Sequence, residues 1–219
     1  VTSSTYRMDS TPDPGAVRRD PENRWLWRFA PRRLEAEAIR DSVLAAAELL
    51  DPTQGGPDLD PAQGQRVYRR SLYFRTSMEK YVPFLAAFDL ANVNECYQRS
   101  ESIVPQQALA LANSPLALTA SRTLAATLTR TSGSGPQSDR AFLTGAFLRL
   151  LGREPNAEEL RQCAEFVQNQ ARRLAHPEAL TAVTSGAAAP TPAAADPAQR
   201  ARESLVHALL NHHEFVTLR

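Results

Sequence analysis

One turn-prone segment, residues 89–101, brings together the widest mixture of reactive side chains in the sequence. It carries carboxylates, a thiol, a phenol and a guanidinium, which are groups used in general acid–base and nucleophilic chemistry. Loops often carry function. The alternative, which we favour, is an arginine–carboxylate network that ties the loop to the helices, because buried polar groups must be paired. The candidate binding residues here are Asp89, Glu95, Cys96, Tyr97 and Arg99, with Arg70 upstream of the loop.

A second titratable cluster lies near the C-terminus, where His207, Asn211, His212, His213 and Glu214 follow one another closely. His207 and Asn211 are four residues apart and share a helix face, a spacing that could place two ligands on one metal. The two histidines that follow point in other directions, and the H-E-x-x-H order of zinc peptidases is absent. Histidines near a helix C-terminus are also favoured by the helix dipole. We expect no metal site.

Other signatures of catalysis are weak. Three close carboxylate pairs suit solvated helix faces or a first helical turn better than acid–base work. No G-x-S-x-G elbow or Cys/His signature surrounds the candidate nucleophiles. We therefore assign no catalytic residue and no cofactor. The pairs are Glu35 with Glu37, Asp58 with Asp60, and Glu158 with Glu159, and the nucleophiles are Ser71, Ser102 and Cys96.

The two cysteines, Cys96 and Cys163, are too few and too far apart for a metal knuckle. A single disulfide between them is allowed and would close a loop of about 67 residues. Cys163 also lies at helical spacing among apolar residues, which suits a small buried side chain. Both alternatives stay open.

The first 29 residues form an irregular arm rich in proline and arginine that ends in Trp25-Leu26-Trp27. We expect these side chains, with Phe29, to act as an anchor that packs the arm onto the body of the protein. The alternative is a stacking platform for a sugar ring or an aromatic partner. Trp25 and Trp27 are therefore further candidate binding residues.

Composition excludes two classes of partner. The 219 residues contain 25 Lys or Arg and 24 Asp or Glu, a formal net charge of +1, whereas a general nucleic-acid binder carries a concentrated basic excess. No run approaches the ~20 apolar residues that a membrane span requires. The 35 alanines, the best helix formers, indicate a mostly helical protein.

The periodicity of apolar residues predicts a mainly α fold, an irregular multi-helix bundle with at most one short β element and long loops. We expect a single domain over residues 1–219, with an arm at 1–30 and an Ala/Pro-rich flexible insertion at 177–199. The expected strand or extended segment is residues 66–76. The expected helices are residues 31–50, 77–88 with a break near Pro83, 105–113, 116–130, 138–151, 156–174 and 198–213.

Seven short segments of the sequence form one recognisable pattern. They are DPENR at 20–24, RRLEAE at 32–37, RRSLYF at 69–74, NVNECYQRS at 92–100, VPQQALALAN at 104–113, AFLRLLGREP at 146–155 and LLNHHEF at 209–215. Together they resemble the planctomycete domain of unknown function 1553, over most of the chain except the Ala/Pro-rich insertion.

This resemblance implies a C-terminal module of a large exported protein, periplasmic or extracellular, whose usual start lies just before Val1. It also implies upstream domains in the same polypeptide, in many members a cytochrome c-like or a lectin-like domain. The family has no established catalytic residues, so none can be carried over.

Our leading hypothesis is a non-catalytic interaction module that packs on its upstream companion and presents a surface to a partner. One alternative is a subdomain of an enzyme that acts on polysaccharide or its sulfated derivatives, with the loop from Asp89 to Arg99 in the cleft. Another is a docking module for the cytochrome c-like domain. The enzyme hypothesis requires an open pocket in which two carboxylates, or a carboxylate and an arginine, converge. The module hypothesis requires those groups to be paired and an apolar patch to be exposed elsewhere.

Overall fold

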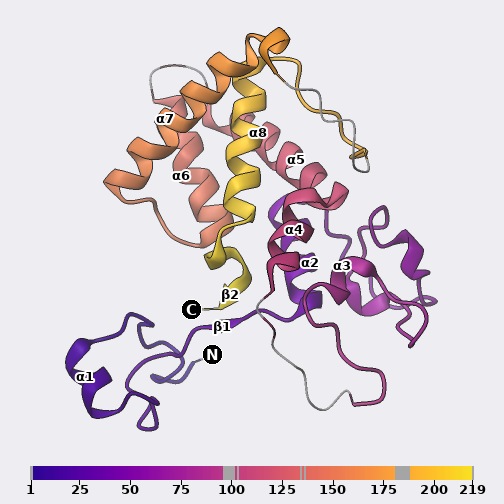
Figure 1. The fold of residues 1–219 in the computed structure, drawn as a ribbon, viewed down its shortest axis with the longest axis vertical. Coiled ribbons are helices and arrows are strands. Elements are labelled where there is room, and N and C mark those ends of the chain that lie inside the picture. The colour runs from indigo at the N-terminus through magenta and orange to yellow at the C-terminus, as the bar shows by residue number, and fades with distance from the viewer. Residues whose placement is uncertain are drawn as a thin grey trace. The chain divides into compact units, whose positions relative to one another are not determined.

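A computed structural model describes residues 2–95, 102, 104–133, 135, 137–180 and 188–218 of the chain (Figure 1). Eight α-helices and one two-stranded antiparallel sheet lie within these residues, which confirms the mainly α prediction. Three of the candidate binding residues, Cys96, Tyr97 and Arg99, lie outside the described residues. The described residues fall into two compact units, a small one of residues 2–34 with 216–218 and a large one of residues 35–215.

The small unit joins the two ends of the chain. Its helix α1, Pro14–Arg19, begins where the Asp13 carboxylate accepts the Ala16 N–H at 2.7 Å. Strand β1, Arg32–Arg33, pairs antiparallel with strand β2, Thr217–Leu218. The prediction that a helix begins at Pro31 was therefore wrong. The strand partner comes from residues almost 200 positions away, about which local periodicity carries no information.

The large unit contains the other seven helices. They are α2 (Ala36–Ala46), α3 (Pro83–Ala86), α4 (Pro105–Asn113), α5 (Pro115–Ser132), α6 (Ser138–Leu151), α7 (Ala157–Leu174) and α8 (Pro197–Leu210). Helix α8 packs against both α5 and α7, and α6 packs against α5 (Figure 1). The core between them includes Leu116, Leu124, Phe142, Phe147, Leu205 and Leu210.

Helix boundaries in the large unit follow proline and capping residues. Pro83, Pro105, Pro115 and Pro197 each begin a helix, where the missing N–H of proline leaves no bond unmade. The predicted helices α4 to α8 are confirmed to within a few residues. The predicted helix over 77–88 was wrong in its first half, because Pro83 starts the helix rather than breaking it.

Residues 66–76 do not form a strand. The segment instead contains a short 3-10 helix, Ser71–Tyr73, flanked by isolated bridges from Asp51 to Arg69 and from Leu59 to Phe74. Parts of this segment are extended, as predicted, but they form no ladder of strand hydrogen bonds. The reason is a side chain of α2 that takes the carbonyl groups of this segment.

That side chain is Arg40, which is fully buried. Its Nη2 donates to the carbonyl oxygens of Val67 (2.6 Å) and Gly64 (3.0 Å), and its Nε donates to Gly64 as well (3.2 Å). Its Nη1 donates to the carbonyl oxygen of Arg69 (2.9 Å) and to Ser71 Oγ (3.2 Å). One guanidinium therefore satisfies three backbone carbonyls that lie 24 to 29 residues further along the chain.

The neighbouring Asp41 completes this attachment. Its carboxylate accepts the backbone N–H (2.8 Å) and the hydroxyl (2.7 Å) of Ser71, and lies 3.7 Å from Arg40 Nη1. Burial lowers the pKa of Arg40 to about 10, so its charge is still present at neutral pH. The Arg40 guanidinium also lies over the Phe74 ring, 4.8 Å from its centroid.

A second network closes the turn between α6 and α7. Arg153 donates to both oxygens of Glu159 (2.6 and 2.9 Å) and to both oxygens of Glu214 (2.9 and 3.0 Å). Glu159 also accepts the Asn156 N–H in a capping box at the start of α7, as the sequence predicts. The hydrogen bond from Arg153 lowers the pKa of Glu159.

The Ala/Pro-rich insertion at 177–199 includes residues 181–187, which lie outside the described residues. On its C-terminal side, Arg122 of α5 donates to the Thr191 carbonyl oxygen. The buried Glu203 of α8 accepts the Ala194 N–H at 3.2 Å. Both contacts attach this part of the insertion to the helices.

Replacing Arg40 tests whether its guanidinium holds residues 64–71. Arg40→Lys and Arg40→Ala leave buried carbonyls without donors, so we expect each to lower the free energy of unfolding by roughly 3–5 kcal/mol in urea denaturation. Lysine offers a point charge with three donors and cannot reproduce the planar fork. The control is Arg70→Ala, whose side chain is 54% exposed and lies 3.4 Å from Asp41. Equal effects of Arg40→Ala and Arg70→Ala would contradict this role.

The Arg153 network predicts a pH dependence. Because the folded pKa of Glu159 lies below its ordinary value of 4.5, the unfolded chain takes up the proton first as the pH falls. The stabilisation is therefore complete at neutral pH and is lost as the pH falls below 4.5 and through the folded pKa. Glu159→Gln should lower the free energy of unfolding by roughly 1–3 kcal/mol at pH 7, a difference that shrinks by pH 3. Glu165→Gln, in an exposed pair with Arg161, should have a much smaller effect. A pH-independent difference for Glu159→Gln would rule out the charge contribution.

Candidate functional site

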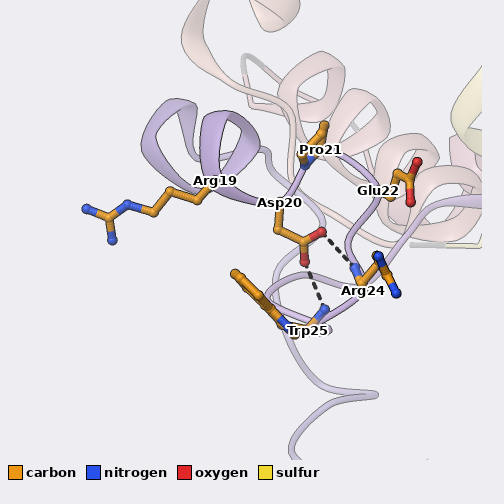
Figure 2. A pocket seen from close by; sticks show the side chains of 6 residues that line it. All are labelled: Arg19, Asp20, Pro21, Glu22, Arg24 and Trp25. Atoms are coloured by element: carbon orange, nitrogen blue, oxygen red, sulfur yellow. Dashed lines mark hydrogen bonds between the residues drawn. The ribbon is translucent and has the colours of Figure 1, made fainter.

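The candidate site is a loop of the small unit, residues 20–28, which we call the Asp20 loop. Asp20 is 6% exposed, and its two carboxylate oxygens accept the backbone N–H groups of Arg24 (3.0 Å) and Trp25 (2.8 Å) (Figure 2). The carbonyl oxygen of Asp20 accepts the indole N–H of Trp27 at 3.0 Å. One acidic residue therefore fixes both the backbone of the loop and one of its two tryptophans.

Asn23 fixes the other end of the same loop. Its Nδ2 donates to the Arg28 carbonyl oxygen at 2.9 Å, and its Oδ1 accepts the Arg28 N–H at 3.3 Å. The backbone of Asn23 is left-handed, with φ of 54°, as is that of Leu26, with φ of 53°. Asparagine tolerates this region, whereas for leucine it costs about 1–2 kcal/mol. The hydrogen bonds around Leu26 must offset that strain, and such strain is concentrated at functional sites.

The loop exposes its apolar tip. Trp25 is 77% exposed and Leu26 is 56% exposed. The Asp20 and Asn23 hydrogen bonds shape the backbone that carries these two exposed side chains, and their role as an anchor on the body of the protein stays a prediction. Phe29 makes an edge contact with Tyr6, at 5.4 Å between ring centroids. Trp27 is half-buried, with the Arg28 guanidinium 5.0 Å from its ring centroid.

Beside the exposed indole lies a hollow of about 730 Å³, drawn in Figure 2. Both oxygens of its central carboxylate, Asp20, are already engaged by backbone N–H groups, so that carboxylate positions the loop. The other charged groups of the hollow make no side-chain hydrogen bond or ion pair in the described part of the chain. The lining residues are Arg19, Asp20, Pro21, Glu22, Arg24 and Trp25.

Other residues singled out from the sequence are paired within the large unit. The Asp89 carboxylate accepts the N–H and the hydroxyl of Ser102, both at 2.7 Å, from a backbone with φ of 60°. Gln107 donates to the Ser102 carbonyl oxygen at 2.9 Å, which ties this contact to α4. Arg70 lies against Asp41 instead, and Glu95 is exposed. The structure therefore joins Trp25 and Trp27 in one loop and places Asp89 and Arg70 in separate contacts.

The C-terminal histidines do not converge on one site either. His207 Nε2 lies 3.3 Å from the Leu111 carbonyl oxygen, and burial lowers the pKa of His207. The His212 and His213 rings contact each other, with 4.5 Å between their centroids. Within the residues that the structure describes, no three His, Cys, Asp or Glu side chains come together as a metal site. Cys163 is a free, half-buried thiol whose pKa is raised by burial.

Sequence reasoning found the tryptophans but missed the residues that position them. Asp20 and Asn23 stand in the phrase Asp-Pro-Glu-Asn-Arg, and short polar side chains of this kind bond to nearby backbone and tolerate left-handed conformations. That turn chemistry could have identified an ordered loop. It gave no indication of which aromatic side chain would remain exposed.

The described residues are rich in helix and include a hydrogen-bonded loop with an exposed tryptophan. The chain belongs to the family PSD1, described as a protein of unknown function (DUF1553), whose model matches residues 1–167. This match confirms the resemblance drawn from the sequence and includes the whole Asp20 loop, while the phrase at 209–215 lies outside it. Comparisons with curated proteins and with solved structures find no match. No helix in the described residues has the length and apolar character to cross a membrane.

Replacing Asp20 tests the construction of the loop. Asp20→Ala removes both acceptors, so we expect the Arg24 and Trp25 amides to exchange hydrogen roughly tenfold faster or more, as the loss of charge-assisted hydrogen bonds implies. Asp20→Asn keeps one acceptor oxygen and should give an intermediate rate. Hydrogen exchange by mass spectrometry measures both, with the amides of α8 as an internal reference.

Glu22→Ala is the matched control for this exchange experiment, since the Glu22 side chain lines the hollow but accepts none of the backbone N–H groups of the loop in the described residues. We expect it to leave the exchange of Arg24 and Trp25 unchanged. If Asp20→Ala leaves these rates at the wild-type value, the carboxylate does not order the loop.

Proposed function

We propose that this chain is a non-catalytic interaction module and that the Asp20 loop is its contact surface. The observation that carries the proposal is that hydrogen bonds accepted by the Asp20 carboxylate and made by the Asn23 side chain order the loop backbone from which the exposed side chains of Trp25 and Leu26 project. Exposed aromatic side chains are typical anchors of binding surfaces. A backbone that is ordered before binding loses little conformational entropy when a partner arrives.

The state of the carboxylates supports a non-catalytic role. Asp89 is engaged by Ser102, Asp41 by Ser71, and Asp20 by the backbone of its own loop. A general acid or base must be able to reach a substrate proton. These three carboxylates are instead held in structural hydrogen bonds.

The wider context belongs to the same proposal. A location outside the cytoplasm, upstream domains in the same polypeptide and a cytochrome c-like partner are implied by the family resemblance. The exposed tip formed by Trp25 and Leu26 gives such a partner a surface to bind, and it requires no reaction at this domain.

A retention experiment tests the proposed function. The wild-type chain, Trp25→Ala and the control Leu148→Ala are immobilised and exposed to an extract of the source organism that contains both proteins and polysaccharides. Leu148 is also an exposed apolar residue, 49% accessible, but lies on α6. Retained proteins are identified by mass spectrometry and retained sugars by composition analysis.

We expect Trp25→Ala to lose at least tenfold of a component that the wild-type chain and Leu148→Ala retain equally. This follows because the loss of an aromatic anchor costs about 2 kcal/mol or more of binding free energy. Identical retention by all three chains would overturn the proposal. Breakdown of the retained component during incubation would overturn its non-catalytic part.

A further inference from the structure

We propose that the hollow of the Asp20 loop binds an acidic polysaccharide, with a sugar ring stacked on Trp25 and its sulfate or carboxylate groups paired with Arg19 and Arg24. This inference rests on the proposed function and names the class of ligand.

The indole provides a surface for a sugar ring. An aromatic face is apolar and electron-rich, so it attracts the C–H face of a pyranose much as it attracts other positively polarised groups. The Trp25 side chain is 77% exposed, and its backbone N–H is held by Asp20 at 2.8 Å. A flat, exposed ring on an ordered backbone therefore lines the hollow (Figure 2).

The charges around the hollow favour an acidic ligand. Arg19 and Arg24 both line it, and neither guanidinium makes a hydrogen bond or an ion pair in the described part of the chain. Residues 1–34 contain seven arginines against four carboxylates, although the whole chain is nearly neutral. Guanidinium groups pair with carboxylate and with tetrahedral oxyanions through two parallel hydrogen bonds.

The arrangement in Figure 2 places these groups on both sides of Asp20. Arg19 and Trp25 extend in one direction, while Glu22 and Arg24 lie on the other side. A chain of sugars that crosses the hollow can therefore stack one ring and place anionic groups at two positions. Glu22 adds a hydrogen-bond acceptor for sugar hydroxyl groups, which a site made of arginines alone would lack.

Two other ligand classes share part of this chemistry. A lipid surface also favours tryptophan and arginine, but the charged lining of this hollow disfavours lipid chains. Single-stranded nucleic acid also combines stacking with a basic groove. A groove that binds single-stranded nucleic acid carries basic residues along several successive phosphates. This hollow has only two arginines in its lining, beside two carboxylates. A polysaccharide uses the indole, both guanidinium groups and the Glu22 carboxylate of the lining.

The test is calorimetric titration of the full chain with defined probes. These are heparin-derived oligosaccharides as sulfated ligands, oligogalacturonates as carboxylated ligands, and cello-oligosaccharides as neutral ones. An oligothymidine strand and phosphatidylserine vesicles represent the other two classes. The variants are Trp25→Ala and the pair Arg19→Ala with Arg24→Ala, and the matched control for charge is Arg140→Ala with Arg173→Ala, exposed positions on α6 and α7.

We expect at least one acidic oligosaccharide to bind more than tenfold tighter than the neutral one. Trp25→Ala should weaken that binding roughly tenfold, in line with single aromatic stacking contacts. The Arg19 and Arg24 pair should weaken it at least tenfold and reduce its salt dependence, while the control pair stays within about twofold.

Several results would overturn the inference. They are equal affinity for neutral and acidic sugars, equal losses in the two arginine pairs, tighter Trp25-dependent binding of the oligothymidine or the vesicles, and no binding of any sugar. If no sugar binds while the retention experiment still yields a component that depends on Trp25, only the ligand class is wrong. If nothing retained depends on Trp25, the proposed function fails as well.

Discussion

The large unit depends on one buried positive charge. Moving a guanidinium out of water costs several kcal/mol, and the structure recovers that cost only because each of the three guanidinium nitrogens of Arg40 donates to an acceptor. Three backbone carbonyls, the Ser71 hydroxyl and the nearby Asp41 surround it. The same bonds satisfy carbonyls that would otherwise need a β ladder. The irregular segment against α2 can therefore be buried without becoming a strand.

The small unit uses the opposite charge in the same way. Asp20 is buried and accepts backbone N–H groups, where Arg40 is buried and donates to backbone carbonyls. In both cases one ionised side chain replaces the hydrogen bonds of regular secondary structure. The difference lies in the result, since Arg40 attaches its segment to a helix, whereas Asp20 folds its loop back on itself. That local closure is what leaves Trp25 available to solvent.

The sequence predicted the elements that nearby residues determine, and it failed where a residue far away in the chain determines the local structure. Helices α4 to α8 have proline or capping residues at their starts and apolar residues at helical spacing, so they could be located. Residues 66–76 could not, because Arg40 lies some 25 residues upstream and its acceptors are backbone groups that any sequence provides. The prediction of a helix beginning at Pro31 failed for a similar reason, since the strand that follows Pro31 pairs with Thr217 and Leu218. At the candidate site, the tryptophans were recognised, but their exposure depends on Asp20 and Asn23.

The Asp20 loop is difficult to explain as a fold-stabilising element alone. Burying an indole would contribute roughly 2–3 kcal/mol, and the loop forgoes most of that contribution at Trp25. It also places the backbone of Leu26 in the left-handed region, where a glycine would relieve the strain. A loop selected for stability alone would turn Trp25 inward and relax Leu26. The observed loop instead uses its hydrogen bonds to order the backbone that carries both exposed side chains, beside two guanidinium groups that make no ion pair within the described residues. Under the proposed function, a bound partner would lower the free energy of this arrangement, because it would cover the indole and neutralise the charges.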